Sequence, residues 1–252
     1  MKRFENKTLL VTGAASGMGL LSAQCFAKEG ANVCMVDINE EAVKEKAAEI
    51  NALDGGRALG VKCDVRDYQQ VTAACDACVV AFGSIDILEN CAGGAATRIL
   101  KCYAKEFHEV PIEVFDWGLD VNLKGAFYFC HAAMKQMAQQ NSGVIVNFGS
   151  ITGEEGCPVN VDYAAAKSAL MNGVVKSLAL AGAPHNVRSV CVAPGPVLTR
   201  AAMANMKTLM GRAAEPQEII DAVMFLASDQ SAFTTGVTLL IDGGRNVMRN
   251  KS

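Results

Sequence analysis

Short runs of apolar, β-prone residues alternate along the chain with longer stretches of helical periodicity. The runs that predict strands are 8–12, 32–37, 58–63, 85–90, 143–148, 187–192 and 237–241. Between them, apolar residues recur three and four positions apart, as on one face of a helix, over 17–29, 40–52, 68–82, 114–140, 162–181 and 216–227. This alternation predicts an α/β protein with a doubly wound parallel sheet of about seven strands and helices on both faces.

Several residues indicate where the predicted helices begin and end. Gly30 should end the first helix, Asn39 should cap the second, and Pro216 should open the last one in its favoured first-turn position. No Pro-, Gly- or Ser-rich linker, internal repeat or change of composition divides the chain. We therefore expect one domain over residues 1–252.

Composition excludes several functional classes. Of the 252 residues, 51% are hydrophobic, and 23 basic against 26 acidic residues give a net charge of -3. Nucleic-acid binding normally requires a basic face, so it is not expected. No apolar run approaches the length of a membrane span. Met1–Phe4 resembles the basic start of a signal peptide, but the apolar run that follows, Leu9–Val11, is too short, so we expect a cytoplasmic protein.

Ten cysteines lie mostly inside apolar runs and show no disulfide-framework spacing. Free thiols that pack as small hydrophobic residues in a reducing compartment explain this usage. Cys75 and Cys78 form a C-x-x-C pair inside an amphipathic helix, without a second Cys pair or a His pair nearby. We therefore predict no metal site.

Three glycines follow the first strand, in Thr12–Gly19 with the pattern G-x-x-x-G-x-G. Glycines there allow a tight turn and a close approach of the backbone to a pyrophosphate. The N-terminus of the following helix supplies free N–H groups and a partial positive charge. The motif is weak by itself, but its place between a strand and a helix is the one that dinucleotide binding requires.

Asp37 closes the second predicted strand. A carboxylate there can accept hydrogen bonds from both hydroxyls of an adenosine ribose and would repel a 2′-phosphate. None of Ala15, Ser16 and Ile38 is basic, so nothing offers a clamp for that phosphate. The charges favour NAD(H) over NADP(H), with a solvated strand end or a helix cap as the structural alternative for Asp37.

Tyr163 and Lys167 stand four positions apart, on one face of a predicted helix. An ammonium beside a phenol favours the phenolate and lowers its pKa, so such a tyrosine can exchange a proton with an alcohol or a carbonyl. The pair is weak alone. Ser150 follows the fifth strand, at the edge where parallel sheets bind ligands. Asn122 is a polar residue in an apolar helix, where a core amide satisfied by the backbone is the alternative.

Together these motifs resemble the short-chain dehydrogenase/reductase family, in its shorter single-domain branch, over nearly all of residues 6–244. The residues that carry the resemblance are Thr12–Gly19, Asp37, Asp64, Val65, Asn90–Gly93, Asn122, Ser150, Tyr163, Lys167, Pro194 and Gly195. The resemblance implies a Rossmann fold and an NAD(H)-dependent oxidoreductase. It also implies a homotetramer or homodimer, formed through the helices that hold Asn122 and Tyr163 and through the last strand.

The family's catalytic roles carry over to four positions. Tyr163 would be the general acid/base, Ser150 would polarise the substrate oxygen, Lys167 would bind the nicotinamide ribose, and Asn122 would hold a water that relays protons. The residues that would contact the dinucleotide are Gly13, Ser16, Gly17, Met18, Gly19, Asp37, Ile38, Asp64, Val65, Asn90, Ala92, Gly93, Tyr163, Lys167, Pro194, Gly195, Val197 and Thr199. Among these, Asp64 and Val65 would meet the adenine, and Thr199 the carboxamide.

Two positions depart from the family pattern. Cys91 and Gly149 replace its usual Asn and Ser, and neither change removes a catalytic group. The stretch 95–115 is longer than usual and could form a wall over the substrate.

The substrate region would contain Thr152, Glu154, Glu155, Cys157, Val159, Met203, Met206 and Met210. Segment 198–212 is either an adaptable lid or a helix that packs its own apolar face. The two glutamates either face a polyhydroxy or cationic ligand or are solvated loop charges.

The small-molecule substrate therefore stays open among a sugar or polyol, a hydroxysteroid and a 3-oxoacyl thioester. Asp37 weighs against the thioester, because reductases of that class usually use NADP(H). A module that only holds the nucleotide would have damaged catalytic positions, and none is seen. Epimerases and dehydratases on this scaffold are usually longer.

Overall fold

The computed structural model describes residues 2–102 and 105–249. Seven strands form one sheet in the order β3-β2-β1-β4-β5-β6-β7, and every neighbouring pair is parallel. The strands are β1 Thr8–Thr12, β2 Asn32–Asp37, β3 Ala58–Lys62, β4 Ile87–Asn90, β5 Gly143–Phe148, β6 Val187–Pro194 and β7 Val237–Ile241. The predicted sheet is confirmed, and most strand ends agree within two residues.

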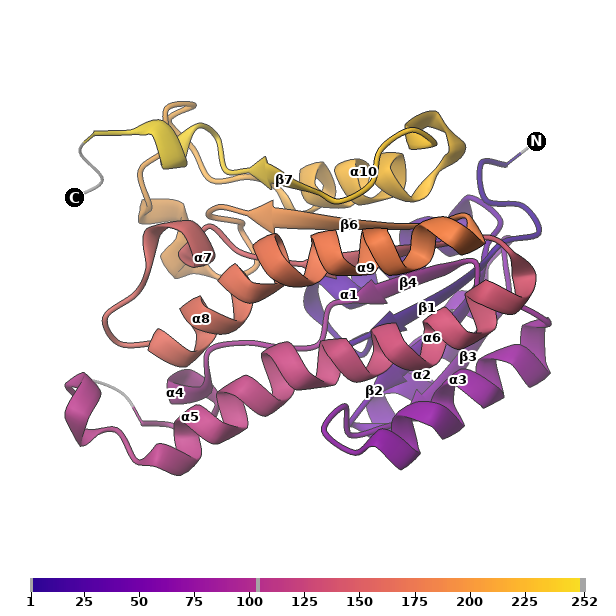
Figure 1. Cartoon of the computed structure of the whole chain (residues 1–252), viewed down its shortest axis with the longest axis horizontal. Helices are drawn as coiled ribbons and strands as arrows, with labels where there is room; N and C mark the ends of the chain where they lie inside the picture. Colours follow the sequence, from indigo (N-terminus) through magenta and orange to yellow (C-terminus); the bar gives the residue numbers. More distant parts are fainter. Residues whose placement is uncertain (1, 103–104, 250–252) are drawn as a thin grey trace.

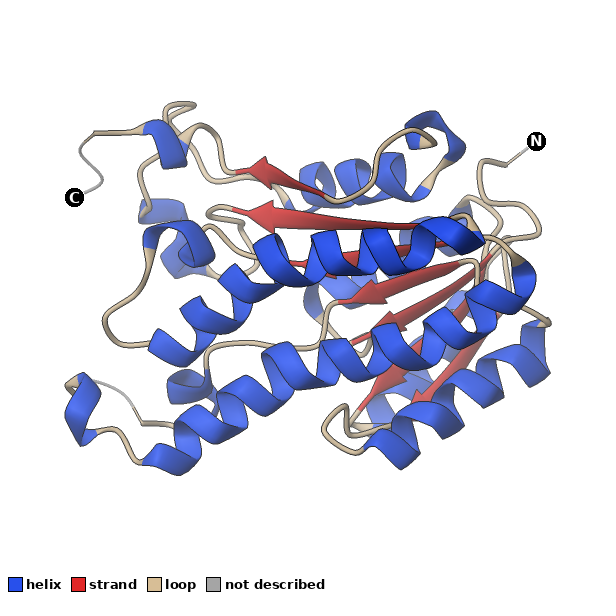
Figure 2. Ribbon diagram, in the orientation of Figure 1, coloured by secondary structure: helices blue, strands red, loops and turns tan. Residues whose placement is uncertain are grey.

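Helices cover both faces of the sheet (Figures 1 and 2). They are α1 Gly17–Lys28, α2 Glu40–Asn51, α3 Tyr68–Phe82, α4 Ala96–Ile99, α5 Ile112–Leu119, α6 Ala126–Gln140, α7 Thr152–Glu155, α8 Val161–Ala169, α9 Val175–Gly182 and α10 Pro216–Ala227. Helices α1, α2 and α10 pack their apolar residues on one face, and α3 and α6 pack theirs on the other. This is the doubly wound arrangement that the sequence predicts.

The central strands are buried on both sides, which explains why their sequences read as unbroken apolar runs. Every residue of β1, β4 and β5 is buried. Phe26 and Ile219 fill the core on the α1 side, while Phe129 and Met137 fill the core on the α6 side. Full burial of side chains of this size contributes about 1.5–3 kcal/mol each.

The predicted helix ends are confirmed. The Asn39 side chain accepts a hydrogen bond of 3.1 Å from the Ala42 N–H at the start of α2. Pro216 is the first residue of α10, behind a capping box formed by Glu215 and Glu218. Gly30 follows α1 with φ of 93°, a left-handed conformation that favours glycine.

Two predicted long helices each contain a π-helical turn. The helix expected over 114–140 consists of α5, a π turn at Asp120–Gly125, and α6. The helix expected over 162–181 consists of α8, a π turn at Leu170–Val174, and α9. A π turn fits one extra residue into the helix and is frequent at functional sites. The first of these turns contains Asn122.

The irregular stretch after β4 also contains helical structure. Helix α4 is followed by a 3₁₀ turn at Phe107–Glu109, before α5 begins. Buried Ala96, Val110 and Val114 form a small apolar cluster of their own. The prediction of an added wall included residues 103–104, which lie outside the described residues.

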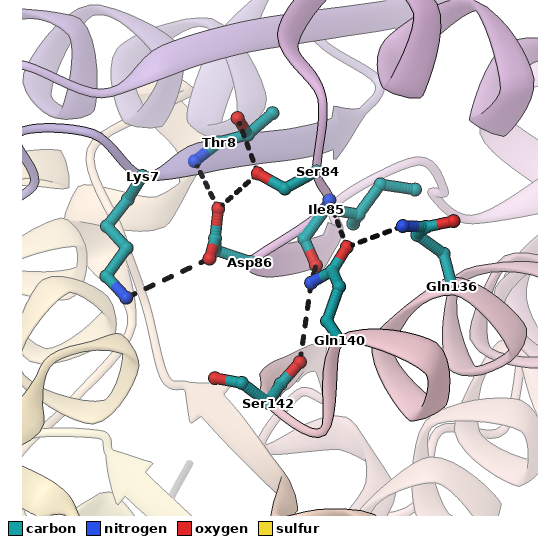
Figure 3. Close-up of polar contacts among 8 residues, drawn as sticks. All are labelled: Lys7, Thr8, Ser84, Ile85, Asp86, Gln136, Gln140 and Ser142. Carbon is teal, nitrogen blue, oxygen red and sulfur yellow. Dashed lines mark hydrogen bonds and ion pairs between the residues drawn. The ribbon is translucent and has the colours of Figure 1, made fainter.

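Side chains satisfy the backbone at the amino edge of the sheet (Figure 3). The Asp86 carboxylate accepts hydrogen bonds from the Thr8 N–H at 2.9 Å and from the Ser84 hydroxyl at 2.6 Å. The Gln140 amide donates to the Ile85 carbonyl and accepts from the Ile85 N–H, both at 3.0 Å. Buried backbone groups need such partners, so these contacts fix where β1 and β4 begin.

The thiols are free, as the sequence predicts. Burial raises the pKa of Cys75 to about 12, and the pKa of Cys78 is also raised. A thiol that stays protonated is a poor metal ligand and a poor nucleophile, so this pair fits a packing role. No helix within residues 2–102 and 105–249 is long and apolar enough to cross a membrane.

Candidate active site

A cavity of about 510 Å³ opens at the carboxyl edge of the sheet. Its walls come from the segments that follow β4, β5 and β6, together with Met18 of α1. In Figure 2 the strand arrowheads point toward the end of the molecule where Figure 1 labels α4 and α7. The strand order reverses between β1 and β4, and open α/β sheets bind ligands beside such a reversal.

The glycine loop after β1 leaves no room for a side chain at Gly13 or Gly19. Gly13 has φ of 66°, and a Cβ there would lie 2.9 Å from the backbone N and Cα of Ala92. A Cβ on Gly19 would overlap the carbonyl oxygen of Gly13. Within the described residues, Ser16 at the N-cap of α1 makes no capping hydrogen bond with its side chain. The helix N-terminus therefore keeps N–H groups for a pyrophosphate, so the loop fits a dinucleotide.

Asp37 joins the end of β2 to this loop. Its Oδ2 accepts a hydrogen bond from the Ala15 N–H, and its Oδ1 accepts one from the Asn39 N–H, both at 3.0 Å. An ionised carboxylate has about four acceptor positions, so two stay available for ribose hydroxyls. Asp37 therefore contacts the turn at the start of α2 and also suits a dinucleotide.

The two residues expected at the adenine lie after β3. The Asp64 carboxylate pairs with the Arg66 guanidinium at 2.6 Å, and these hydrogen bonds hold the pKa of Asp64 below its ordinary value. Val65 packs against Gly125, where a Cβ would lie 2.6 Å from Val65 Cγ2. Ile38, also expected at the cofactor, is 61% exposed.

Tyr163, Lys167 and Ser150 line the same cavity. The Lys167 Nζ atom lies 5.5 Å from the centre of the Tyr163 ring. Lys167 is only 4% exposed and donates a hydrogen bond of 2.7 Å to the Phe148 carbonyl. In the described part of the chain no carboxylate forms a salt bridge with it. The Lys167 side chain is therefore held in the cavity wall beside the Tyr163 ring.

Ser150 stands at the start of the loop that follows β5. Its Oγ accepts a hydrogen bond of 3.2 Å from the Thr152 N–H, which orients the hydroxyl at the start of α7. Ser150 thus lies on the same cavity as Tyr163 and Lys167, and the catalytic roles of the three residues stay a prediction.

Asn122 lies behind the cavity wall instead of on it. Its Oδ1 accepts from the Gly94 N–H at 2.9 Å, and its Nδ2 donates to the carbonyls of Gly94 at 3.0 Å and Gly118 at 2.9 Å. The backbone thus satisfies this buried amide, which was the alternative interpretation of the residue. Its contacts fix the segment after β4 beside Lys167, since a Cβ on Gly93 would lie 3.7 Å from Lys167 Nζ.

Asn90 was expected to line the cofactor, but its side chain points into the core. Its Nδ2 donates to Asn147 Oδ1 at 2.9 Å and to the Ala126 carbonyl at 3.3 Å. As the last residue of β4 it faces α6, because successive residues of a strand point to opposite faces. The Ala92 N–H instead donates to the Thr12 hydroxyl at 3.0 Å, which ties this segment to the glycine loop.

Sequence reasoning missed Glu89, a fully buried carboxyl in the middle of the sheet. It lies opposite Val11 on β1 and Val146 on β5, and its Oε2 accepts a hydrogen bond of 2.6 Å from the Ser22 hydroxyl. Burial raises the pKa of Glu89 to about 7. A charged residue inside an apolar strand run was the signal that could have found it.

Cys91 lines the cavity next to this carboxyl. Its Sγ lies 3.9 Å from Glu89 Oε2, and burial raises its pKa well above the ordinary value. Its thiol therefore stays protonated at neutral pH, in keeping with the packing role that the sequence predicts for the cysteines.

The expected substrate residues divide into two groups. Thr152, Cys157, Val159, Met203 and Met206 line the cavity, whereas Glu154, Glu155 and Met210 do not. Glu155 instead pairs with Arg245 at 3.1 Å, with both side chains largely buried. Glu155 is therefore held by Arg245, and the exposed Glu154 fits the alternative of a solvated loop charge. Three further residues line the cavity that the sequence patterns did not predict there, Arg98, Lys105 and Arg200.

Segment 198–212 is a loop closed at its base. The Leu198 N–H donates to the Ala214 carbonyl, and the Ala214 N–H donates to the Pro196 carbonyl, both at 2.9 Å. A 3₁₀ turn at Ala201–Asn205 has no buried residue, so it does not pack an apolar face of its own. Movement of this segment as a lid stays a prediction.

Comparisons with known proteins agree with this geometry. The family described as enoyl-(acyl carrier protein) reductase matches residues 13–246. D-threitol dehydrogenase of Mycolicibacterium smegmatis is 37% identical over 255 residues, which cover 97% of this chain and 95% of that protein. A 3-oxoacyl-[acyl-carrier-protein] reductase of Chlamydia muridarum is 34% identical over 250 residues, covering 95% and 97%.

This chain belongs to the short-chain dehydrogenase/reductase family. The crystal structure of an NAD⁺-bound xylitol dehydrogenase superposes with a TM-score of 0.85 at 30% identity, covering 96% of this chain and all of that one. The short-chain dehydrogenase/reductase assignment makes the chain an oxidoreductase that acts on CH–OH groups or the corresponding carbonyls.

Proposed function

We propose that this short-chain dehydrogenase/reductase transfers a hydride between NAD(H) and a secondary alcohol or ketone of the polyol or hydroxysteroid type. The observation that carries the proposal is the meeting of Tyr163, Lys167 and Ser150 on one cavity at the carboxyl edge of the sheet. Relatives that act on threitol and xylitol favour the polyol type.

The cofactor preference rests on charge. Asp37 presents a carboxylate beside the glycine loop, where it suits ribose hydroxyls and repels a 2′-phosphate. Neither Ala15 nor Ile38, its neighbours in the loop and the chain, supplies a cation. When bound, the nicotinamide accepts the hydride in alcohol oxidation and gives it in ketone reduction.

The chain's own residues handle the proton and the substrate oxygen. Tyr163 takes the proton from the substrate hydroxyl during oxidation, because the buried Lys167 ammonium stabilises the phenolate that remains. The Ser150 hydroxyl donates to the substrate oxygen and fixes its position beside the phenol. In reduction the same groups act in reverse.

Asn122 takes a positioning role in this scheme. Its amide holds both polar backbone groups of Gly94, so it fixes the wall that faces Lys167. Its Oδ1 has a second acceptor position, which suits the water relay that the family resemblance implies.

A 3-oxoacyl thioester is the second candidate substrate. It is favoured by the similarity to the chlamydial 3-oxoacyl-[acyl-carrier-protein] reductase. The preference for NADH expected from Asp37 weighs against it. We also infer a homotetramer or homodimer, which mass measurement by light scattering tests directly.

Kinetics with NAD⁺, NADP⁺ and a panel of polyols, hydroxysteroids and hydroxyacyl thioesters test the proposal. Tyr163→Phe should reduce kcat by at least about 10²-fold while NADH binding, followed by fluorescence, persists. Tyr68→Phe is the matched control, since the Tyr68 hydroxyl contacts His131 and neither residue lines the cavity. Substantial turnover by Tyr163→Phe would overturn the assigned proton transfer.

A further inference from the structure

The candidate substrate cavity has a one-sided charge. Arg98, Lys105 and Arg200 line it in addition to Lys167, and no Asp or Glu is among its described lining residues. The chain as a whole carries a net charge of -3, so this cavity departs from the average of the molecule. A charge of one sign in a concave site concentrates ligands of the opposite sign.

Arg98 packs against the segment that lies beside Lys167. It belongs to α4, and its guanidinium packs over Gly94, where a Cβ would lie 3.0 Å from Arg98 Nη2. Gly94 is the residue that Asn122 holds through both backbone groups, next to Gly93 and Lys167. Asp37, the residue expected at the adenosine ribose, does not line this cavity. The guanidinium is therefore placed for a substrate and not for the adenosine end of a dinucleotide.

The wall that carries Arg98 is fixed to the rest of the fold. The Thr97 hydroxyl donates to the Asn160 side chain, which joins α4 to the loop before α8. Ala96 packs into the apolar cluster with Val110 and Val114. A guanidinium on a fixed element can bind a carboxylate through two parallel hydrogen bonds, and it remains charged at every physiological pH.

We propose that the substrate carries an anionic group besides the carbon that is oxidised or reduced, and that Arg98 binds this group with the help of Lys105 and Arg200. The inference rests on the proposed function, because it concerns the substrate of that same site. A carboxylate and a phosphate monoester share the required chemistry. Within the proposed substrate types, a polyol phosphate or a hydroxysteroid that carries a carboxylate then becomes a better substrate than the matching neutral compound.

Matched pairs of compounds that differ only in charge test the proposal. The pairs are 3-hydroxybutyrate with 3-hydroxybutyramide, 4-hydroxycyclohexanecarboxylate with its carboxamide, and a phosphorylated polyol with the free polyol. We expect kcat/KM to be about 10- to 100-fold higher for the anion of at least one pair. The pair that shows the preference identifies carboxylate or phosphate as the anionic group. Added salt should raise KM for the anion and leave KM for its neutral partner unchanged.

Substitution of Arg98 tests whether this residue causes the preference for the anion. Arg98→Gln should remove most of the preference, because kcat/KM should fall about tenfold or more for the anion and by a smaller factor for the neutral compound. Lys101→Gln is the matched control, because Lys101 is exposed on the same segment and does not line the cavity. An equal loss for both members of a pair would indicate a structural role and would overturn the proposal.

The outcomes separate this inference from the proposed function. If neutral alcohols are oxidised with NAD⁺ as well as the anions are, the proposed function stands and the anionic substrate is refuted. If no compound turns over, calorimetric titration of the anions and their neutral partners into the enzyme–NADH complex shows whether the anion binds more tightly. Binding of the anion that Arg98→Gln abolishes supports the inference, and equal or absent binding of both partners refutes it.

Discussion

Replacing Glu89 by Gln should change how the stability of this protein depends on pH. Glu89 is fully buried in β4, between Val11 and Val146, and the Ser22 hydroxyl is its hydrogen-bond donor. Its other carboxyl oxygen, Oε1, has no partner among the described residues. Burial disfavours the charged form and raises the pKa of Glu89 from 4.5 to about 7. A Gln side chain has the same shape and carries no charge.

The direction of the effect follows from proton binding. Between pH 4.5 and 7 the folded state holds the Glu89 proton more tightly than the unfolded state does, so stability falls as the pH rises through this window. At 1.36 kcal/mol for each unit of pKa, the difference between 4.5 and about 7 corresponds to about 3 kcal/mol. About 2.5 kcal/mol of this loss lies between pH 5 and pH 8.

Thermal unfolding of the wild type and of Glu89→Gln at pH 5 and pH 8 measures how the difference between their Tm values changes with pH. Groups other than residue 89 titrate in both proteins and cancel in the comparison. In a chain of this length, each kcal/mol changes Tm by about 2–4 °C. The Tm of Glu89→Gln minus the Tm of the wild type should therefore rise by about 5–10 °C from pH 5 to pH 8.

Glu113→Gln is the control, because Glu113 is exposed and its charge stays in water. It should show no such growth. Parallel pH profiles for wild type and Glu89→Gln would refute the reasoning, since they would mean that the buried carboxyl binds its proton equally well in both states.

Three further perturbations follow from the described contacts. Gln140→Leu leaves the N–H and C=O of Ile85 without their partners, so the free energy of unfolding in urea should fall by about 1–3 kcal/mol, and an unchanged midpoint would contradict this. Gly13→Ala places a Cβ 2.9 Å from the backbone of Ala92, so NADH binding measured by fluorescence should be lost. The helical signal in circular dichroism should stay unchanged. Tight NADH binding by this variant would contradict the prediction, because it would show that the loop adapts. Cys91 should resist iodoacetamide at neutral pH, because burial raises its pKa, and mass spectrometry that finds it alkylated in active enzyme would disprove this.

Local patterns were enough to predict the helices and strands and to place Tyr163 beside Lys167. Tyr163 and Lys167 share a helix face because a spacing of four residues is close to one turn, whatever the rest of the chain does. The caps at Asn39 and Pro216 likewise depend on the nearest few residues. Sequence alone therefore predicts the parallel sheet and the pair at its carboxyl edge.

Contacts between distant parts of the chain could not be predicted in this way. The fate of Glu155 depends on Arg245, 90 positions later, which takes it away from the cavity. Asn122 is satisfied by Gly94, 28 positions earlier, inside a π turn that helical periodicity does not distinguish from an ordinary helix.

The charge of the candidate substrate cavity also depends on contacts between distant parts of the chain. The sequence determined the fold, the glycine loop after β1 and the placement of Tyr163 and Lys167 on one helix face, because short-range spacing and strand order fix them. Only the tertiary structure decided that Arg98 faces the cavity while Glu155 does not, since that outcome depends on how separate segments pack against one another. Burial, which sets the ionisation of Glu89, is likewise a property of the assembled sheet.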